Sequence, residues 1–323
     1  MTRVAVLDDW QKIARGSADW SELSKRADVV FFDRAFAGED DIAEKLGDFE
    51  ILLTMRERTA FPVSLVRRLP KLRMLGMTGM RAASIDTAAL RAQGVTVCYT
   101  SGGGSGAATA ELTLGLILAA ARQIPAADAA IRDGRFQDGT APGFELAGKT
   151  LGVIGLGRLG SRVAKYCRAL DMRIVAWSQN LTAEKAAAAG ATLVGKDELL
   201  ATADVLTLHL VLSDRTRGII GAAELQRMKP GAVLVNTSRG PLVDEPALVA
   251  TLRTGRLIAA LDVYDREPLP AGHPLRGIPN LVMTPHLGYG SAETFKDFYR
   301  QSVENAVAFL DGKPVRVLEL PKA

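Results

Sequence analysis

The chain has 323 residues, of which 48% are hydrophobic, 24% charged and 6% aromatic, and its formal net charge is +4. This length predicts about two domains, and the high apolar content with a small net charge excludes a largely disordered chain. The 40 basic residues are scattered among 36 acidic ones, so we do not expect a nucleic-acid partner. The apolar run at 112–121 contains a glycine and ends at an arginine, and no signal-peptide core follows Met1, so we expect no membrane association.

The first hundred residues alternate between strand-like and helix-like segments. Near-continuous apolar strands that alternate with helices are typical of a parallel sheet covered on both faces. The predicted strands are 4–7, 29–32, 51–54, 72–77 and 95–99, with helices between them such as 40–46 and 87–93.

The pattern changes at residues 101–106, a glycine-rich stretch that we interpret as a hinge, and a long apolar helix is predicted at 107–122. A second alternating series begins near Thr150 and ends with an amphipathic helix at 291–310. Its predicted strands are 150–154, 173–177, 192–194, 205–210, 232–236, 257–262 and 281–284. The expected fold class is therefore α/β, with two doubly wound parallel-sheet (Rossmann-like) domains and the active site in the cleft between them.

The strongest local motif is Gly155-Leu-Gly-Arg-Leu-Gly160, which follows a predicted strand and opens a predicted helix. In this setting Gly155 allows a tight turn, Gly157 lets the backbone approach a pyrophosphate, and Gly160 lets the helix pack against the strand. The N–H groups at the helix start, with Arg158, are positioned to bind phosphate oxygens. The motif predicts a dinucleotide cofactor.

The next strand, 173–177, is followed by Ser178, Gln179 and Asn180, where an NAD-binding protein usually has a carboxylate for the ribose diol. Without that carboxylate a 2′-phosphate is not repelled, so NADP is slightly favoured and NAD stays possible.

Three further predicted strands end in reactive side chains: Arg239, Glu267 and His286. The carboxyl ends of parallel strands meet at one edge of a sheet, so we expect these side chains to converge. Among the three histidines of the chain, His286 is the candidate acid or base, and His273 is interpreted as a loop residue.

The ordered set GLGRLG, MKPGAVLVNTSRGPLVDEPAL, ALDVYDREPL and NLVMTPHLG resembles the D-isomer-specific 2-hydroxyacid dehydrogenases, which include D-3-phosphoglycerate dehydrogenase and glyoxylate/hydroxypyruvate reductases. The resemblance covers almost the whole chain. It implies a discontinuous, flavodoxin-like substrate domain at 1–100 plus 292–323, and a dinucleotide-binding domain at 101–291.

By this resemblance the catalytic residues are Arg239, Glu267 and His286, and Asp262 holds the nicotinamide amide. The cofactor residues implied together by the motif and the resemblance are Gly155, Gly157, Arg158, Leu159, Gly160, Ser178, Gln179, Asn180, His209, Leu210, Thr237, Ser238, Arg239, Asp262, His286 and Gly288. Those expected for the substrate are Arg56, Thr78, Gly79, Met80, Arg81, Arg239 and His286. No metal ligand is expected.

The chemistry of these residues fits reduction of a small 2-keto acid by NAD(P)H. Charged His286 would supply the proton, Glu267 would favour the imidazolium, and Arg239 would bind the substrate carboxylate and carbonyl oxygen. Reduction should then weaken, and oxidation strengthen, as pH rises through the titration of His286.

Glyoxylate or hydroxypyruvate is the expected substrate. Cys98 and Cys167 lie in apolar segments, where we expect reduced thiols, and this favours a cytoplasmic location. The resemblance implies a homodimer formed through the cofactor domain. Two alternatives stay open: a dehydrogenase of another small anion, such as phosphoglycerate or phosphite, and a dinucleotide-sensing, corepressor-like binding protein. Proline before His286 disfavours the formate-specific branch of the family.

Overall fold

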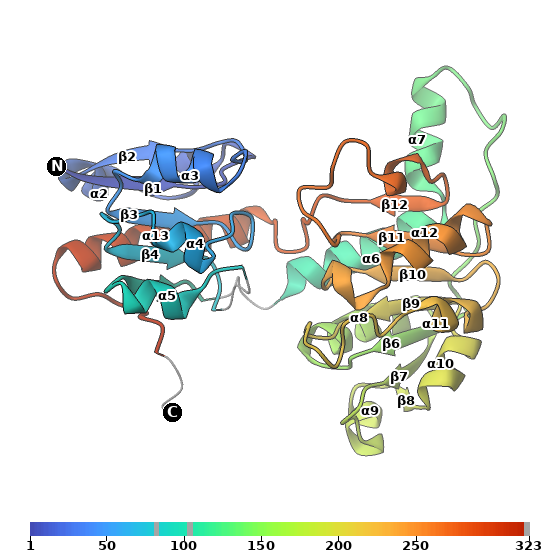
Figure 1. Cartoon of the computed structure of the whole chain (residues 1–323). Helices are drawn as coiled ribbons and strands as arrows, with labels where there is room; N and C mark the ends of the chain where they lie inside the picture. The colour runs from blue at the N-terminus through green and yellow to red at the C-terminus, as the bar shows by residue number, and fades with distance from the viewer. Residues whose placement is uncertain (81–83, 102–105, 320–323) are drawn as a thin grey trace. The chain divides into compact units, whose positions relative to one another are not determined.

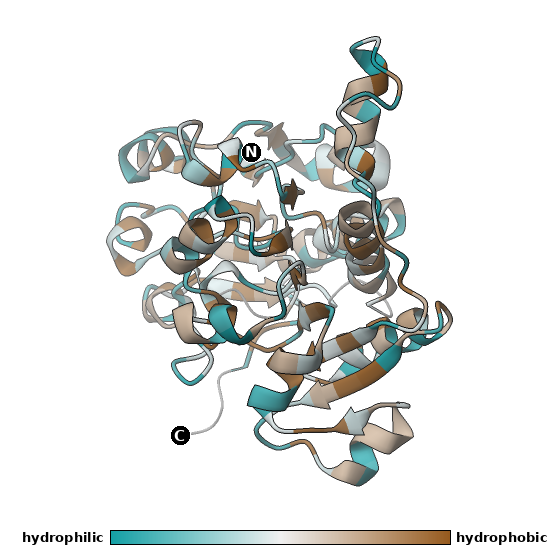
Figure 2. Ribbon diagram, turned by 90° about the vertical axis from the view of Figure 1, so that its right-hand side faces the viewer, coloured by the Kyte–Doolittle hydropathy of each residue, from teal (hydrophilic) through white to brown (hydrophobic). Residues whose placement is uncertain are grey.

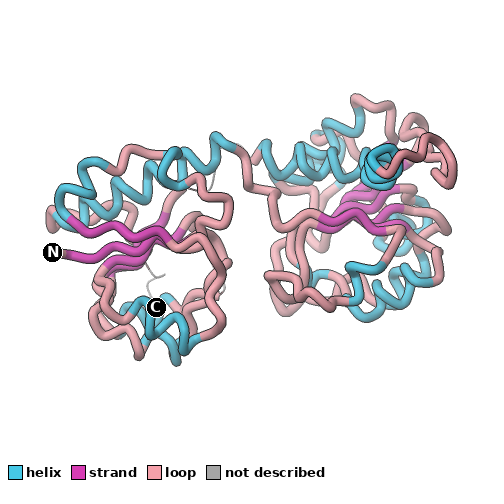
Figure 3. The backbone as a smooth tube through the Cα atoms, turned by 90° about the horizontal axis from the view of Figure 1, so that it is seen from above, coloured by secondary structure: helices cyan, strands magenta, loops and turns pink. Residues whose placement is uncertain are grey.

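The computed structural model describes residues 1–80, 84–101 and 106–319, and the chain divides into two compact units. Unit 1 comprises Met1–Ser105 with Ser291–Ala323, and unit 2 comprises Gly106–Gly290. Each unit is built on one parallel sheet with helices on both faces (Figures 1 and 3). The predicted fold class of two doubly wound α/β domains is therefore confirmed.

Unit 1 has a five-stranded sheet in the order β2-β1-β3-β4-β5, the flavodoxin-like order. Helices α3, α4 and α5 cover one face, while α13 packs on β4 and β5 with α1 and α2 beside it. The strands are β1 (Thr2–Val6), β2 (Ala27–Phe31), β3 (Ile51–Thr54), β4 (Met74–Met77) and β5 (Thr96–Tyr99), and the helices are α1 (Ala14–Ser17), α2 (Ser21–Arg26), α3 (Glu39–Leu46), α4 (Val63–Val66), α5 (Thr87–Ala92) and α13 (Ala292–Leu310).

Unit 2 has a seven-stranded sheet in the order β12-β11-β10-β9-β6-β7-β8, with every neighbouring pair parallel. Its strands are β6 (Thr150–Ile154), β7 (Arg173–Trp177), β8 (Thr192–Leu193), β9 (Val205–Leu208), β10 (Val233–Asn236), β11 (Ile258–Leu261) and β12 (Leu281–Met283). Its helices are α6 (Ala107–Ala121), α7 (Ile124–Arg132), α8 (Arg158–Arg168), α9 (Ala183–Ala188), α10 (Lys196–Thr202), α11 (Ala222–Arg227), α12 (Glu245–Arg253) and the short 3₁₀ turns η1 (Gly240–Leu242) and η2 (Pro274–Gly277).

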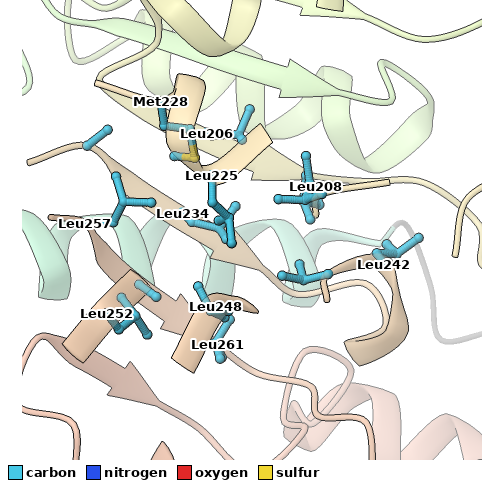
Figure 4. Close-up of a cluster of buried hydrophobic side chains, with 14 of the residues drawn as sticks. Leu206, Leu208, Leu225, Met228, Leu234, Leu242, Leu248, Leu252, Leu257 and Leu261 are labelled. Atoms are coloured by element: carbon cyan, nitrogen blue, oxygen red, sulfur yellow. The ribbon is translucent and has the colours of Figure 1, made fainter. Parts of the chain in front are cut away.

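The core of unit 2 lies on both faces of its sheet. On one face, leucines of β9, β10 and β11 pack against α10, α11 and α12. Figure 4 shows the leucines that these strands share with α11 and α12. On the other face α6 and α8 cover the same strands through alanine, valine and leucine side chains. The strands are hydrophobic along much of their length (Figure 2), as expected for parallel strands buried on both sides. Such burial keeps the strand ends, where the polar residues lie, in fixed positions.

The predicted helix at 107–122 agrees with α6 to within one residue, but the helix that follows it, α7, was not predicted. Helix α6 ends at Ala121, and the chain bends by 64° before α7 begins at Ile124. Gln123 has a left-handed backbone with φ of 53°, and Pro125 occupies the first turn of α7, where proline starts a new helix more readily than it continues one. Within the described residues no single helix is long and apolar enough to span a bilayer; α6 and α7 pass that test only as a bent pair.

The predicted strands at 205–210 and 257–262 are too long. Strand β9 ends at Leu208 and β11 ends at Leu261, because the chain leaves the ladder there to form loops. His209 makes one last ladder-like hydrogen bond, from its N–H to the Ile154 carbonyl oxygen at 2.8 Å. His209, Leu210 and Asp262 therefore lie in loops just beyond the sheet.

Candidate active site

The carboxyl ends of the strands carry most of the side chains that the sequence singled out. In doubly wound sheets, ligands bind at this edge where the strand order reverses. In unit 2 the order reverses between β6 and β9. The glycine-rich loop after β6 and the His209 loop after β9 flank that point.

The three glycines of the loop after β6 have three different environments. Gly155 has φ of 97°, and a Cβ there would lie 2.6 Å from the His209 carbonyl oxygen. A Cβ on Gly160 would collide with the Gly155 carbonyl oxygen, so this glycine lets α8 pack closely on the loop. A Cβ on Gly157 would meet nothing within 4 Å. The backbone at Gly157 is thus open to a ligand, at the N-terminus of the 11-residue helix α8.

His209 lies against this loop and is held by its own strand. Its Nε2 is 3.0 Å from Thr207 Oγ1, while its buried Nδ1 has no hydrogen-bond partner among the described residues. Burial lowers the pKa of His209 to about 4, so the ring is neutral at physiological pH. An orphaned ring nitrogen beside an open glycine loop fits the site of a polar cofactor.

Strand β7 ends at Trp177, and Ser178, Gln179 and Asn180 follow it. Ser178 is half-buried and the other two are exposed. These residues could reach a ribose or a phosphate through hydroxyl and amide groups.

The Arg239 loop after β10 is shaped by buried Asn236. The Asn236 Nδ2 donates to the Arg239 carbonyl oxygen at 2.8 Å, and its Oδ1 accepts from the Ser238 N–H at 3.0 Å. Ser238 Oγ donates to the Leu208 carbonyl oxygen at 2.8 Å, which fastens the loop to β9. A Cβ on Gly240 would collide with the Tyr264 backbone, so the Arg239 loop packs backbone to backbone against the loop after β11. Half-buried Arg239 thus has a fixed backbone.

Glu267 and His286 meet although 19 residues separate them. Glu267 Oε2 lies 2.5 Å from His286 Nδ1, and Glu267 Oε1 accepts from the Tyr264 N–H at 2.9 Å. The side chains are 33% and 22% exposed, so solvent screens the pair only in part. His286 has φ of 54°, a left-handed conformation that costs a non-glycine residue energy and is found preferentially at functional sites. Because Nδ1 faces Glu267, Nε2 is the nitrogen that a substrate can contact.

Asp262 holds the loop that carries His286. This fully buried carboxylate accepts from Thr284 Oγ1 at 2.6 Å, from the Leu287 N–H at 2.7 Å and from the Gly288 N–H at 2.8 Å. Burial raises the pKa of the Asp262 carboxyl, while these hydrogen bonds oppose the rise. Three of its acceptor positions are therefore used inside the protein, and its contact with a nicotinamide stays a prediction.

In unit 1, residues expected for the substrate gather at the ends of β3 and β4. The Arg56 N–H donates to Thr78 Oγ1 at 2.7 Å, and Arg56 Nη1 donates to the Thr78 carbonyl oxygen at 3.3 Å. A Cβ on Gly79 would collide with Arg56 Nη1, so the guanidinium lies directly over this glycine. Arg56 also has a left-handed backbone, with φ of 53°. The cluster places the Arg56 guanidinium at the carboxyl edge of the sheet, with its Nε 3.7 Å from Glu57 Oε2.

The remaining predicted residues differ in their surroundings. Met80 is 56% exposed, and Arg81 lies outside the described residues. Thr237 is buried and its Oγ1 lies 2.8 Å from Thr113 Oγ1 of α6, so this hydroxyl serves packing inside unit 2. A Cβ on Gly288 would lie 3.1 Å from Asp262 Oδ2, a close approach that only glycine tolerates well.

Sequence reasoning did not find Asn236, Gly240 or Tyr264 as parts of the site. A polar residue at the end of a buried strand and a glycine next to a candidate arginine were the available signals for the first two. Tyr264 contributes through its backbone N–H and through its hydroxyl, which donates to the Thr284 carbonyl oxygen at 3.0 Å. A backbone role of that kind leaves no mark in the sequence.

Comparison with known proteins identifies the family to which this chain belongs. Residues 114–288 match the family described as D-isomer specific 2-hydroxyacid dehydrogenase, NAD binding domain. The glyoxylate reductase of Aeropyrum pernix is 42% identical over 300 residues, which are 90% of this chain and 89% of that protein. The D-3-phosphoglycerate dehydrogenase of Archaeoglobus fulgidus is 36% identical over 278 residues, 86% of this chain but only 52% of that protein. The chain thus spans about half the length of this relative.

Solved structures agree with the sequence comparison. The phosphoglycerate oxidoreductase of Vibrio cholerae O395 superposes with a TM-score of 0.91 at 37% identity, covering 97% of this chain and 100% of that one. The matched region includes the glycine loop, Arg239, Glu267 and His286. The protein belongs to the D-isomer-specific 2-hydroxyacid dehydrogenases, a family with a nicotinamide dinucleotide cofactor.

Proposed function

We propose that this protein reduces the C2 carbonyl of a small 2-keto acid, and oxidises the matching D-2-hydroxy acid, with a nicotinamide cofactor. The observation that carries the proposal is the 2.5 Å contact between His286 Nδ1 and Glu267 Oε2. A histidine paired with a carboxylate through Nδ1 can hold a proton on Nε2 and release it to a substrate oxygen.

Each residue of the site in unit 2 has a separate proposed role. Charged His286 donates its Nε2 proton to the carbonyl oxygen, and the Glu267 carboxylate stabilises the imidazolium before transfer. Arg239 binds the substrate carboxylate and the carbonyl oxygen, where negative charge develops. Asp262 and Tyr264 hold the two loops, so the imidazole does not need to be oriented during the reaction. A nicotinamide cofactor, when bound, would supply the hydride for C2, and the proton from His286 would go to the oxygen to give the hydroxy acid.

The cofactor would bind along the loop after β6. The N–H groups at the start of α8 and the open face of Gly157 would receive the pyrophosphate, and His209 lies beside them. We propose NADPH as the slightly preferred cofactor, supported by the lack of a carboxylate at 178–180. In unit 1, Arg56 beside Thr78 and Gly79 would supply a cation for the substrate.

The substrate class rests on chemistry and on the named relatives. Glyoxylate and hydroxypyruvate are the substrates we propose, and phosphoglycerate is the alternative. The test is the loss of NADH or NADPH absorbance with glyoxylate, hydroxypyruvate and pyruvate, and its gain with 3-phosphoglycerate or phosphite. Turnover of a keto acid that disappears in His286→Gln supports the proposal. Tight NADH binding without turnover of any substrate would instead favour the dinucleotide-sensing alternative.

We also propose a homodimer formed through unit 2. Helix α7 stands away from the unit 2 sheet (Figure 1), and Ile124, Ile131 and Phe136 of this region are 52%, 53% and 75% exposed. Apolar side chains exposed together in this way favour a protein partner. Light scattering is expected to give twice the monomer mass for the wild type and a lower mass for Phe136→Asp. A cytoplasmic location also stays a proposal, supported by the buried free thiols of Cys98 and Cys167.

A further inference from the structure

Unit 2 contains a second histidine–carboxylate pair, His273 with Glu245, in addition to His286 with Glu267. Glu245 begins α12, and its Oε1 is 3.0 Å from Nε2 of His273. Its other oxygen, Oε2, accepts from the Asp265 N–H at 3.3 Å. The side chains of Glu245 and His273 are only 16% and 19% exposed. Solvent therefore screens this pair less than it screens an ordinary surface pair.

His273 is anchored on its other side. It precedes the 3₁₀ turn η2, and its Nδ1 accepts from the Leu275 N–H at 3.4 Å. Leu275 is fully buried in the hydrophobic cluster shared by β9, β10 and β11. Because Nδ1 accepts a hydrogen bond, the proton of the neutral ring lies on Nε2 and points to Glu245. The imidazole thus joins Glu245 to the core without needing a charge.

Glu245 in turn reaches the loop that carries Glu267. Asp265, whose N–H binds Glu245, follows Tyr264, whose N–H binds Glu267 Oε1 at 2.9 Å. The same stretch of backbone lies against Gly240, where a side chain would collide with it. The loop after β11 is thereby held between α12 and the Arg239 loop.

We propose that His273 and Glu245 are positioning residues that fix the loop at 264–267 and so keep the Glu267 carboxylate against His286. The inference rests on the proposed function for its effect on turnover. Its effect on the His286 ring does not depend on any substrate.

The charges around the pair agree with a structural role of this kind. Burial, followed by the nearby charges of Glu245 and Asp244, raises the pKa of the Asp265 carboxyl, while Arg217 and His273 oppose the rise. Arg276 holds the far side of the loop through the carbonyl oxygens of Leu269 and Pro270, at 2.7 and 2.9 Å. A gathering of three carboxylates keeps its geometry only when its cations and N–H donors stay in place.

The test measures the His286 ring directly. The chain has three histidines, so their ring signals in a histidine-labelled protein can be assigned with His286→Gln and His273→Gln. In Glu245→Ala we expect the titration midpoint of His286 to fall by about half a pH unit or more, because a loosened Glu267 stabilises the imidazolium less. We expect kcat for keto-acid reduction to fall about 10-fold, with KM and the Kd for NADPH within about twofold.

Two conservative variants refine the test. His273→Gln keeps an amide N–H that can donate to Glu245 and should stay close to the wild type, whereas His273→Ala should resemble Glu245→Ala. Glu245→Gln keeps an oxygen that can accept from the Asp265 N–H, and it should show an intermediate shift of the His286 midpoint. These variants also serve if Glu245→Ala does not fold.

Glu224 provides a matched control. It lies in the first turn of α11, pairs with Lys196 at 2.9 Å and accepts from the Gly221 N–H at 3.0 Å, but it contacts a different loop. Glu224→Ala should lower Tm without changing the His286 titration. If Glu245→Ala and His273→Ala also change only Tm, the positioning proposal is wrong. A shifted His286 midpoint in a protein that turns over no keto acid would support positioning and contradict the proposed function.

Discussion

Both units are doubly wound α/β sheets, and in each sheet the strand order reverses at one place, the switch point. The residues that line this switch point differ between the two units. In unit 2, the point between β6 and β9 is bordered by glycines, and Gly157 faces open space. In unit 1, the order reverses between β1 and β3, and the protein's own side chains join the two loops there. Arg58 Nη1 donates to the Asp8 carbonyl oxygen at 2.6 Å, and Thr59 Oγ1 donates to Asp8 Oδ1 at 2.8 Å.

Sheet topology thus determines where a ligand site can form, and the local residues determine whether a ligand can bind there. A glycine in such a loop leaves the backbone open to a ligand, as at Gly157 of unit 2. In unit 1 the two loops hold a buried carboxylate, Asp8, and two arginines, Arg56 and Arg58, which make hydrogen bonds within the protein. Arg58 also stacks on the Trp10 ring, 4.5 Å from its centroid, which stiffens this part of unit 1.

The largest effect is expected at the His286–Glu267 pair of unit 2. His286→Gln removes the proposed proton donor, so we expect kcat for keto-acid reduction to fall by about 10²–10⁴-fold. The Kd for NADPH should change little, because Gln preserves much of the side-chain volume. Stopped-flow measurement of NADPH oxidation checks the first value and fluorescence titration the second. A kcat within a few-fold of the wild type would exclude His286 as the acid.

The second prediction concerns Asp8, the buried carboxylate at the switch point of unit 1. Burial raises its pKa to about 6, against the lowering effects of Thr59 and Arg58. The folded state then binds more protons than the unfolded state between pH 4 and 6, so ionised Asp8 lowers stability as pH rises through that range. Asp8→Asn should be more stable than the wild type above pH 6, by about 3 kcal/mol at most, because the pKa shift is about two units.

Denaturant unfolding at a series of pH values measures this effect. The free energies of the two proteins should converge below about pH 4, where Asp8 is protonated in both states. Asparagine also tolerates the left-handed backbone at this position, where φ is 62°. A constant difference at all pH values would show that the Asp8 charge is not the cause.

The same contrast explains what could be predicted from the sequence. Strands β6 and β7 follow from continuous apolar runs, and their predicted bounds are those observed. The turn at Gly155 and the close packing at Gly160 follow from one local motif. The meeting of Glu267 with His286 was an expectation from sheet topology and family resemblance, because no local pattern relates residues 19 positions apart.

Other features could not be predicted because they depend on packing. An aspartate just after a strand normally indicates an exposed turn, yet Asp8 is fully buried. Its burial results from the β3 loop lying over it, and a sequence pattern does not record that contact. Helix α7 was not predicted, although Pro125 in its first turn is a signal for the start of a helix.

Two glycines of unit 2 give the next test. A side chain at Gly157 would enter the open space proposed for the cofactor, whereas a side chain at Gly160 would collide with the protein itself. Gly157→Val adds a side chain into open space, so Tm should hold while the Kd for NADPH rises about 10-fold or more through steric exclusion. Gly160→Val forces a side chain against the Gly155 carbonyl oxygen and should lower Tm as well. Calorimetry and fluorescence titration on both variants compare the two effects. An equal loss of Tm in both would contradict the distinction.

The smallest effect concerns the cofactor's ribose, at the end of β7. Ser178 is the first residue after this strand, where a carboxylate would accept hydrogen bonds from a ribose diol and repel a 2′-phosphate. Ser178→Asp should therefore shift the ratio of kcat/KM for NADPH over NADH by about 10-fold toward NADH, which is about 1.4 kcal/mol of differential binding. Ser178→Asn, which has a similar size without the charge, is the matched control and should leave the ratio near that of the wild type. If both variants shift the ratio equally, side-chain shape rather than charge governs the choice of cofactor, and the proposed preference for NADPH is wrong.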